Sequence, residues 1–291
     1  MNFLQSVFLG LVQGITEFLP VSSSGHLMIF EQLMHFEGDI EFFNVFLHVG
    51  TLFAIMIGMQ RDIVKLFKAF VAMAKDCFYN MKLYMKSGSS EKEPHYRRII
   101  SNNYRKLVLI IIIATIPTAI IGYVLNSFVG GGSYSMIMVG IGMLISGVLM
   151  MVVSRVKPRG KLPRDIGLSG TLLTGVAQGM AVLPGISRSG AVITCGILLG
   201  FSTRLSIRFS YLLSIPAVIG ALILELSRIS TEGTVTIAFI GCCAAGAFTA
   251  MIVGLLVIHA MMHMVGRRGI GAFSLYCFVI GFAVILLSYL I

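Results

Sequence analysis

Six long apolar segments constrain this chain of 291 residues more than any other feature. Each approaches or exceeds the roughly 20 apolar residues with which an α-helix crosses the hydrocarbon core of a bilayer. The chain is 57% hydrophobic and 12% charged, whereas soluble domains carry about 25% charged residues. This composition excludes a soluble enzyme, a disordered chain and a secreted disulfide scaffold. The predicted spans are residues 42–60, 107–126, 134–154, 207–226, 235–259 and 270–291.

Two further apolar regions, residues 1–34 and 166–200, are interrupted by proline, glycine and several serines. Neither region predicts one unbroken span. Each can instead enter the membrane, turn, and leave on the side that it entered, as a re-entrant helical hairpin. Irregular backbone at membrane depth is tolerated only where it is buried in protein or lines a wet cavity. The two breaks therefore indicate an internal binding site.

The two broken regions carry related sequences at a constant offset of 165 residues. Residues 13–25 read QGITEFLPVSSSG, and residues 178–190 read QGMAVLPGISRSG. The opening Gln-Gly, two of the serines and the closing glycine coincide, which indicates an internal repeat. Each repeat holds one hairpin and three spans. Because three is odd, the second copy must be inverted in the membrane.

We therefore predict an all-α polytopic membrane protein, with six transmembrane helices and two re-entrant helical hairpins in an inverted-topology repeat. The first repeat covers residues 1–154 and includes a cytoplasmic loop at 61–106. The second, inverted repeat covers residues 166–291. One hairpin, at 1–34 or 166–200, opens each repeat.

Charge gives the expected orientation. Eleven of the 22 Lys and Arg residues lie between 61 and 106, and five more between 155 and 164. Basic clusters beside spans mark cytoplasmic loops. With the first span running inward, inside regions hold 20 basic residues and outside regions hold only Arg228. The expected partner of these charges is the anionic inner leaflet rather than nucleic acid, and the basic amphipathic stretch 61–85 predicts surface helices that lie on that leaflet.

Two ionisable residues, Glu17 and Arg188, lie inside the repeat motifs. An arginine at the centre of a span costs about 2.5–3.5 kcal/mol on insertion scales, so such residues are expected to have a function. The inverted repeat should bring both hairpin tips together near the midplane, with Glu17 and Arg188 as partners. The polar residues expected around this pair are Gln13, Ser22, Ser23, Ser24, His26, Gln178, Ser187 and Ser189.

This set of residues suits phosphate chemistry. Arg188 presents a planar fork that binds phosphate oxygens in a bidentate way. The turn from Gly185 to Gly190 lets backbone N–H groups point at an anion. Serine hydroxyls can attack phosphorus, while a carboxylate and an imidazole can move protons or hold a divalent cation. The set predicts hydrolysis of a phosphoryl group on a lipid-borne substrate, and by itself it also suits an anion transporter.

The same motifs resemble the two signatures of the bacterial undecaprenyl pyrophosphate phosphatases, the bacitracin-resistance family. The first signature corresponds to Gln13-x-x-x-Glu17 followed by Pro20-Val-Ser-Ser-Ser-Gly-His26, and the second to Pro184-Gly-Ile-Ser-Arg-Ser-Gly190. The resemblance implies release of inorganic phosphate from undecaprenyl pyrophosphate, which recycles the lipid carrier of cell-wall synthesis and confers bacitracin resistance. It also implies a divalent cation, Mg²⁺ or Ca²⁺, and the bacterial plasma membrane, with an active site that opens to the outer face.

Carried over residue by residue, the resemblance gives roles to Gln13, Glu17, Ser23, His26, Ser187, Arg188 and Ser189, and the polar residues and glycine beside them complete the predicted site. The predicted catalytic residues are Glu17, Ser23, His26 and Arg188, and the nucleophile is Ser23, His26 or water. Glu17 and Gln13 are the predicted cation ligands. The predicted substrate-binding residues are Gln13, Ser22, Ser24, Gly185, Ser187, Ser189 and Gln178. One departure is Val192, which stands where the family often has threonine; Thr194 follows two residues later.

The alternative function is that of a secondary transporter or polyprenyl-phosphate flippase, because inverted repeats with broken helices are typical of transporters. The two motifs differ at the three places that matter most for chemistry: Glu17 aligns with Val182, His26 with Ala191, and Ser23 with Arg188. A symmetric carrier does not need this difference, so the motifs favour an enzyme. The expected partners are the polyprenyl pyrophosphate substrate and membrane lipids. A homodimer is one open option for the oligomeric state.

Overall fold

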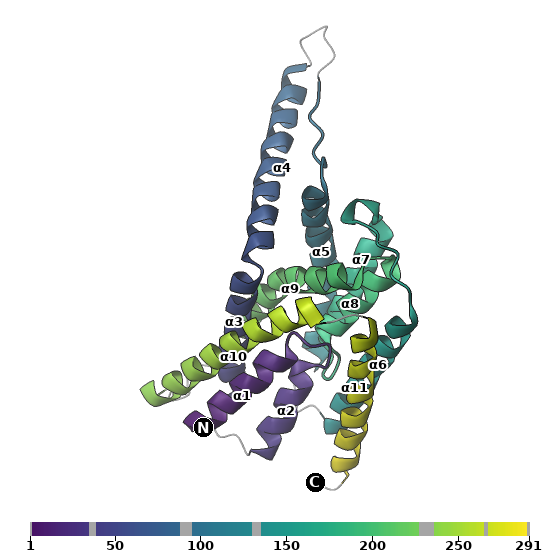
Figure 1. Ribbon diagram of the computed structural model, residues 1–291. Coiled ribbons are helices and arrows are strands. Elements are labelled where there is room, and N and C mark those ends of the chain that lie inside the picture. The colour runs from purple at the N-terminus through teal and green to yellow at the C-terminus, as the bar shows by residue number, and fades with distance from the viewer. Residues whose placement is uncertain are drawn as a thin grey trace.

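The computed structural model describes residues 2–34, 39–87, 95–129, 135–226, 236–264 and 267–289. Within these ranges the chain forms eleven α-helices and one 3-10 helix, and it contains no β-strand (Figure 1). The helices are α1 (Phe3–Thr16), α2 (Ser23–Leu33), α3 (Ile40–Gly58), α4 (Gln60–Ser87), α5 (Asn103–Val129), α6 (Met136–Arg155), η1 (Pro163–Asp165), α7 (Leu168–Met180), α8 (Arg188–Leu199), α9 (Thr203–Leu226), α10 (Ile237–Met264) and α11 (Arg267–Leu287).

Six helices are long and apolar enough to cross a membrane, and each falls on one of the six predicted segments. They are Ile40–Gly58, Asn103–Leu125, Met136–Arg155, Thr203–Leu224, Ile237–His263 and Ile270–Leu287. Their ends differ from the predicted ends by about four residues or fewer, which is the usual uncertainty at frayed helix termini. The prediction of a six-span, all-α membrane protein is confirmed.

Each broken region forms a pair of short helices, α1–α2 and α7–α8. These helices have 14, 11, 13 and 12 residues in chain order. Since an α-helix rises 1.5 Å per residue, even α1 is only about 21 Å long, shorter than the ~30 Å hydrocarbon core. Two helical hairpins therefore lie where the sequence predicts them. Their re-entrant insertion and the inverted topology stay predictions.

The two halves of the chain pack into each other. α1 lies along α10, and α7 lies along α5 in the corresponding place. Gly10 and Gly175, which are 165 residues apart in sequence, make both contacts possible. A Cβ atom at Gly10 would clash with the backbone of Gly246, and one at Gly175 would clash with the backbone of Ala114. Each hairpin thus rests on a span of the other half, while the division into repeats at 1–154 and 166–291 stays a prediction.

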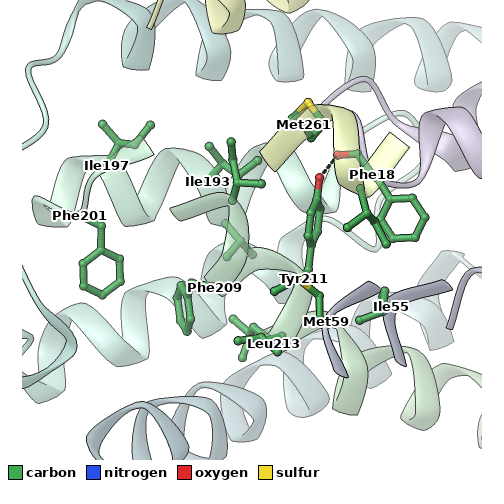
Figure 2. Close-up of a cluster of buried hydrophobic side chains, with 14 of the residues drawn as sticks. Phe18, Ile55, Met59, Ile193, Ile197, Phe201, Phe209, Tyr211, Leu213 and Met261 are labelled. Atoms are coloured by element: carbon green, nitrogen blue, oxygen red, sulfur yellow. Dashed lines mark hydrogen bonds between the residues drawn. The ribbon is translucent and has the colours of Figure 1, made fainter. Parts of the chain in front are cut away.

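The main hydrophobic core joins both hairpins to the spans (Figure 2). It includes Phe18 after α1, Ile193 of α8 and Tyr211 of α9, all of them fully buried. The Tyr211 hydroxyl donates a hydrogen bond of 3.0 Å to the Phe18 carbonyl oxygen, which Figure 2 draws as a dashed line. The two rings also meet edge to face, with centroids 5.4 Å apart. This core fixes the break between α1 and α2 against α9.

The helix α4 departs from the predicted placement on the inner leaflet. It is one helix of 28 residues, and it continues from the end of α3 away from the other helices (Figure 1). A helix that continues a membrane span cannot lie flat on the leaflet, so that prediction is wrong. Residues 95–102 return beside α4, and we call α4 and these residues the arm. The Asn80 side chain makes two hydrogen bonds of 2.8 Å with the Arg97 backbone.

A carboxylate on α4 also holds the returning chain. Asp76 accepts from Arg105 at 2.7 Å and from Arg97 at 3.4 Å. These contacts, the hydrogen bond from Arg105 foremost, hold the pKa of Asp76 below its usual value of 3.8. A carboxyl group whose pKa is lowered by folding stabilises the folded form above its unfolded pKa. This contribution is lost as the pH falls below 3.8 and through the lowered pKa.

We expect Asp76→Asn to loosen the returning chain of the arm, because the substitution removes the charge that holds Arg97 and Arg105. Limited trypsin digestion of the detergent-solubilised protein should then cut after Arg97 faster than in the wild type. Asp165→Asn is the matched control. It also removes one carboxylate, but the ion-pair partner of Asp165 is the exposed Arg164. Equal cleavage rates in the wild type and both variants would contradict this role of Asp76.

Candidate active site

The carboxylate of Glu17 joins the two hairpins. Glu17 caps the C-terminus of α1 and is buried. Its Oε1 accepts a hydrogen bond from Arg188 Nη2 at 2.5 Å. Its Oε2 accepts from Ser23 Oγ at 2.6 Å and from Gln13 Nε2 at 3.2 Å. The breaks of both hairpins therefore meet at one carboxylate, and the predicted pairing of Glu17 with Arg188 is confirmed.

Two serines at equivalent repeat positions explain why Ser23 and Arg188 reach the same carboxylate. Ser22 caps α2 by accepting from the Gly25 N–H at 3.3 Å, and Ser187 caps α8 by accepting from the Gly190 N–H at 3.0 Å. A serine at this position satisfies an N–H group that the first turn leaves free. Ser23 and Arg188 are consequently the first residues of their helices. The repeat thus presents a hydroxyl from one hairpin and a guanidinium from the other.

The helices α6 and α11 hold the two breaks in the same way. The Gly185 carbonyl oxygen accepts from Ser146 Oγ of α6 at 3.2 Å. Pro20, which lies 165 residues earlier, accepts from Cys277 Sγ of α11 at 3.7 Å. Gly185 has φ +82°, and a Cβ there would clash with the Val139 carbonyl oxygen. Close packing on α6 therefore accounts for this glycine, and its role as a substrate contact stays a prediction.

The turn before α8 offers fewer anion-binding N–H groups than the sequence predicts. The N–H groups of Ile186, Ser187, Gly190 and Ala191 already donate within the protein. Those of Arg188 and Ser189 have no acceptor in the described part of the chain. The Ser189 hydroxyl donates to the Leu19 carbonyl oxygen at 3.0 Å, across to the first hairpin. An anion at this helix start would thus meet two free N–H groups beside the guanidinium.

His26 is bonded to a tyrosine that the sequence analysis missed. Its Nδ1 lies 2.7 Å from the Ser22 carbonyl oxygen, and its Nε2 lies 2.7 Å from the Tyr276 hydroxyl of α11. Because a carbonyl oxygen only accepts, Nδ1 carries the proton, and the tyrosine donates to Nε2. The rings stack at 5.7 Å between centroids. No local pattern could have revealed Tyr276, since 250 residues separate the two partners in sequence.

Four predicted or debated residues have no contact with Glu17 among the described hydrogen bonds. The amide of Gln178, the repeat counterpart of Gln13, donates to Thr118 Oγ1 of α5 at 3.4 Å. Ser24 Oγ lies 3.4 Å from Ser22 Oγ, within the cap of α2. Val192 is fully buried in the main core, so no hydroxyl stands there. Thr194 is also buried, and its hydroxyl has no hydrogen-bond partner among the described residues. A substrate contact from any of these residues stays a prediction.

The oxygen atoms around Glu17 fit a hard divalent cation. Gln13 is fully buried, and its Oε1 has no hydrogen-bond partner in the described chain. Together with the carboxylate of Glu17 it offers the oxygen ligands that Mg²⁺ and Ca²⁺ prefer. The described residues contain no group of three or more His, Cys, Asp or Glu side chains that could hold a metal by themselves. Such an ion would therefore need oxygen ligands from a bound phosphate and water.

The arrangement combines the elements of a phosphoryl-transfer site. A hydroxyl donates to a carboxylate that can take its proton, and a guanidinium beside them can bind an anion. Only the first hairpin supplies the carboxylate and the imidazole, because Val182 and Ala191 stand at the equivalent places of the second. The serine caps are thus repeated, while the carboxylate and the imidazole are not.

Comparisons with known proteins place the chain among its relatives. The family described as bacitracin resistance protein BacA matches residues 6–283. An undecaprenyl-diphosphatase of Alkaliphilus metalliredigens is 34% identical over 295 residues, which cover 100% of both chains. The undecaprenyl-diphosphatases of Syntrophotalea carbinolica and Methanosphaera stadtmanae are 35% and 34% identical, over 97% and 99% of this chain and equal shares of theirs. This chain therefore belongs to the bacitracin resistance protein family.

Proposed function

We propose that the chain is an integral-membrane phosphatase that hydrolyses undecaprenyl pyrophosphate to undecaprenyl phosphate and inorganic phosphate. The observation that carries this proposal is the contact of one buried carboxylate, Glu17, with both the Ser23 hydroxyl and the Arg188 guanidinium. The relatives named undecaprenyl-diphosphatase support the choice of substrate. The proposed physiological role is recycling of the lipid carrier for cell-wall synthesis, which confers bacitracin resistance.

Substrate binding engages the start of α8. The terminal phosphate binds the Arg188 guanidinium and the free N–H groups of Arg188 and Ser189, with the hydroxyl of Ser187 beside them. A phosphate oxygen and Glu17 compete for the same guanidinium. As the phosphate draws Arg188 away, Glu17 loses the cation that stabilises its ionised form and becomes a stronger base. Binding of the anion thus prepares the carboxylate to accept a proton.

Chemistry then proceeds at the terminal phosphorus. Ser23 Oγ attacks this phosphorus while its proton moves to Glu17, and the bond to the departing undecaprenyl phosphate breaks. A water molecule next attacks the phosphorus of the Ser23 phosphate ester, and the bond between phosphorus and Ser23 Oγ breaks. One proton of this water goes to Ser23 Oγ, and the phosphate departs as inorganic phosphate. Glu17 releases its proton to solvent. Ser23 is favoured over His26 because Tyr276 donates to the His26 Nε2 lone pair. Direct attack by water with Glu17 as base is the second route.

A divalent cation, Mg²⁺ or Ca²⁺, completes the proposed site. Gln13 Oε1 would hold it, and Glu17 serves either as its second ligand or as the base. The bound ion would neutralise charge on the pyrophosphate. We place the protein in the bacterial plasma membrane with the site open to the outer face, because the basic loops assign both ends of the first hairpin to the outside. The transporter or flippase alternative is not favoured, since the two repeat motifs carry different reactive groups.

Glu17→Ala and Arg188→Ala should each lower phosphate release at least 100-fold, because charge stabilisation and base catalysis each contribute about 10²–10⁴-fold. The assay uses purified protein in detergent with farnesyl or undecaprenyl pyrophosphate and Mg²⁺ or Ca²⁺. Arg208→Ala is the matched control, since it breaks a different ion pair, that with Asp62 at 3.3 Å. Near-normal hydrolysis by either site variant, with an unchanged unfolding temperature, would overturn the assignment.

Ser23→Ala should reduce kcat by orders of magnitude, because it removes the proposed nucleophile. Ser24→Ala, one residue along the same helix start, should change KM at most. Rapid quenching with substrate labelled in the terminal phosphate should trap the label on the wild type and not on Ser23→Ala. A Ser23→Ala variant with the kcat of the wild type would shift the assignment to attack by water.

Tyr276→Phe should lower kcat roughly tenfold and leave KM unchanged, because the variant loses the hydrogen bond that orients the His26 ring, which assists proton transfer beside Ser23. Steady-state kinetics with farnesyl pyrophosphate measure both constants. Tyr123→Phe removes a hydroxyl from an exposed tyrosine on α5 and serves as the control. A higher KM with unaltered kcat would show that Tyr276 acts in substrate binding rather than in positioning His26.

A further inference from the structure

One face of α4 carries a row of apolar side chains at alternating spacings of three and four residues. We call this row the heptad stripe; its members are Val64, Phe67, Val71, Ala74, Phe78, Met81 and Met85. Apolar residues that keep this spacing over three or more heptads are typical of helices in a coiled coil. No position of the stripe is interrupted by a polar residue.

The stripe has no partner within the described arm. Phe67, Phe78 and Met85 are 66%, 64% and 77% exposed. The returning chain covers a different face of α4, where Asp76 and Asn80 make their contacts. Asp76 follows Ala74 by two residues, which is about 200° around a helix. The returning chain therefore covers the face of α4 that carries Asp76 and Asn80, and it leaves the heptad stripe open.

Lipid does not account for this open face. α4 continues in line from the membrane span α3 and leads away from the other helices, so the greater part of the stripe extends beyond the apolar bundle (Figure 1). A contiguous exposed apolar surface in such a place marks an interaction site for protein. The regular spacing identifies the partner surface as a second helix.

We propose that α4 forms a parallel two-stranded coiled coil with α4 of a second copy of this chain. Two copies inserted in one membrane with the same orientation have arms that point the same way, so a two-fold axis along the membrane normal pairs these helices in parallel. Val64, Val71, Phe78 and Met85 then occupy a positions, and Phe67, Ala74 and Met81 occupy d positions. Branched residues such as Val64 and Val71 at a positions favour two strands.

The charges that flank the stripe agree with this parallel pairing. Lys68, Lys75 and Lys82 all follow a d residue and occupy e positions. In a parallel pair an e residue faces a g residue of the other helix, and Phe70 is a g residue. Lys75 would lie beside the partner's Phe70, a favourable cation–π pair. An antiparallel pair would instead set lysine against lysine, which the charges disfavour.

Disulfide cross-linking of the full chain in native membranes tests the pairing. The parent variant is Cys77→Ser with Cys242→Ser, which removes the two cysteines that are not buried. Ala74→Cys introduces a thiol at a d position, where two copies face each other, and Ala72→Cys places the same thiol on another face. Oxidation should give a covalent dimer with Ala74→Cys and none with Ala72→Cys. No dimer, or equal dimer from both variants, would overturn the proposal.

The oligomeric state provides the second measurement. The wild type should elute as a dimer in detergent by light scattering, and Phe78→Lys should elute as a monomer, because it buries a charge in the seam. Ala72→Lys adds the same charge away from the seam and should remain dimeric. A monomeric wild type overturns the proposal, as does cross-linking of Ala74→Cys to another polypeptide alone. Quenching of a fluorophore at Ala74→Cys by brominated lipids would assign the stripe to the leaflet instead.

Discussion

A charged hydrogen-bond network across two helical hairpins governs the architecture of this protein. Glu17 follows α1 and Arg188 begins α8, and each would be costly in an apolar interior without the other. The remaining contacts near the breaks keep these two side chains in reach. Tyr211 holds the backbone after Glu17, while Ser146 holds the turn before Arg188. The spans thus act as a frame for one ion pair.

The two related motifs share their serine caps, but only the first motif carries a carboxylate and an imidazole. Serine caps begin both α2 and α8, and a polar side chain of α6 or α11 bonds each break. Yet the first position of one helix is Ser23 and that of the other is Arg188. Both contact the carboxylate that only the first repeat carries. The two halves therefore contribute different side chains to the contacts of one carboxylate.

Hydropathy predicted the six spans because burial in lipid demands length and apolarity, and both are local properties. The repeat offset predicted the contact of Glu17 with Arg188, since both residues lie at equivalent breaks of the two related motifs. Tyr276 could not be predicted, because its hydrogen bond to His26 depends on the packing of two helices that lie far apart in the sequence. The prediction that residues 61–85 lie on the inner leaflet was wrong, because an amphipathic helix has the same sequence pattern on a leaflet as in a contact with another helix. Only the direction of α4 after α3 distinguishes these two placements.

The interlocked halves also set an order on assembly. α1 rests on α10, so α1 lacks its main packing surface until α10 is made. Closure of such a long loop disfavours early docking, so α1 packs against α2 and α3 before it packs against α10. Glu17, at the C-terminus of α1, consequently reaches its final packing only after α10 is in place.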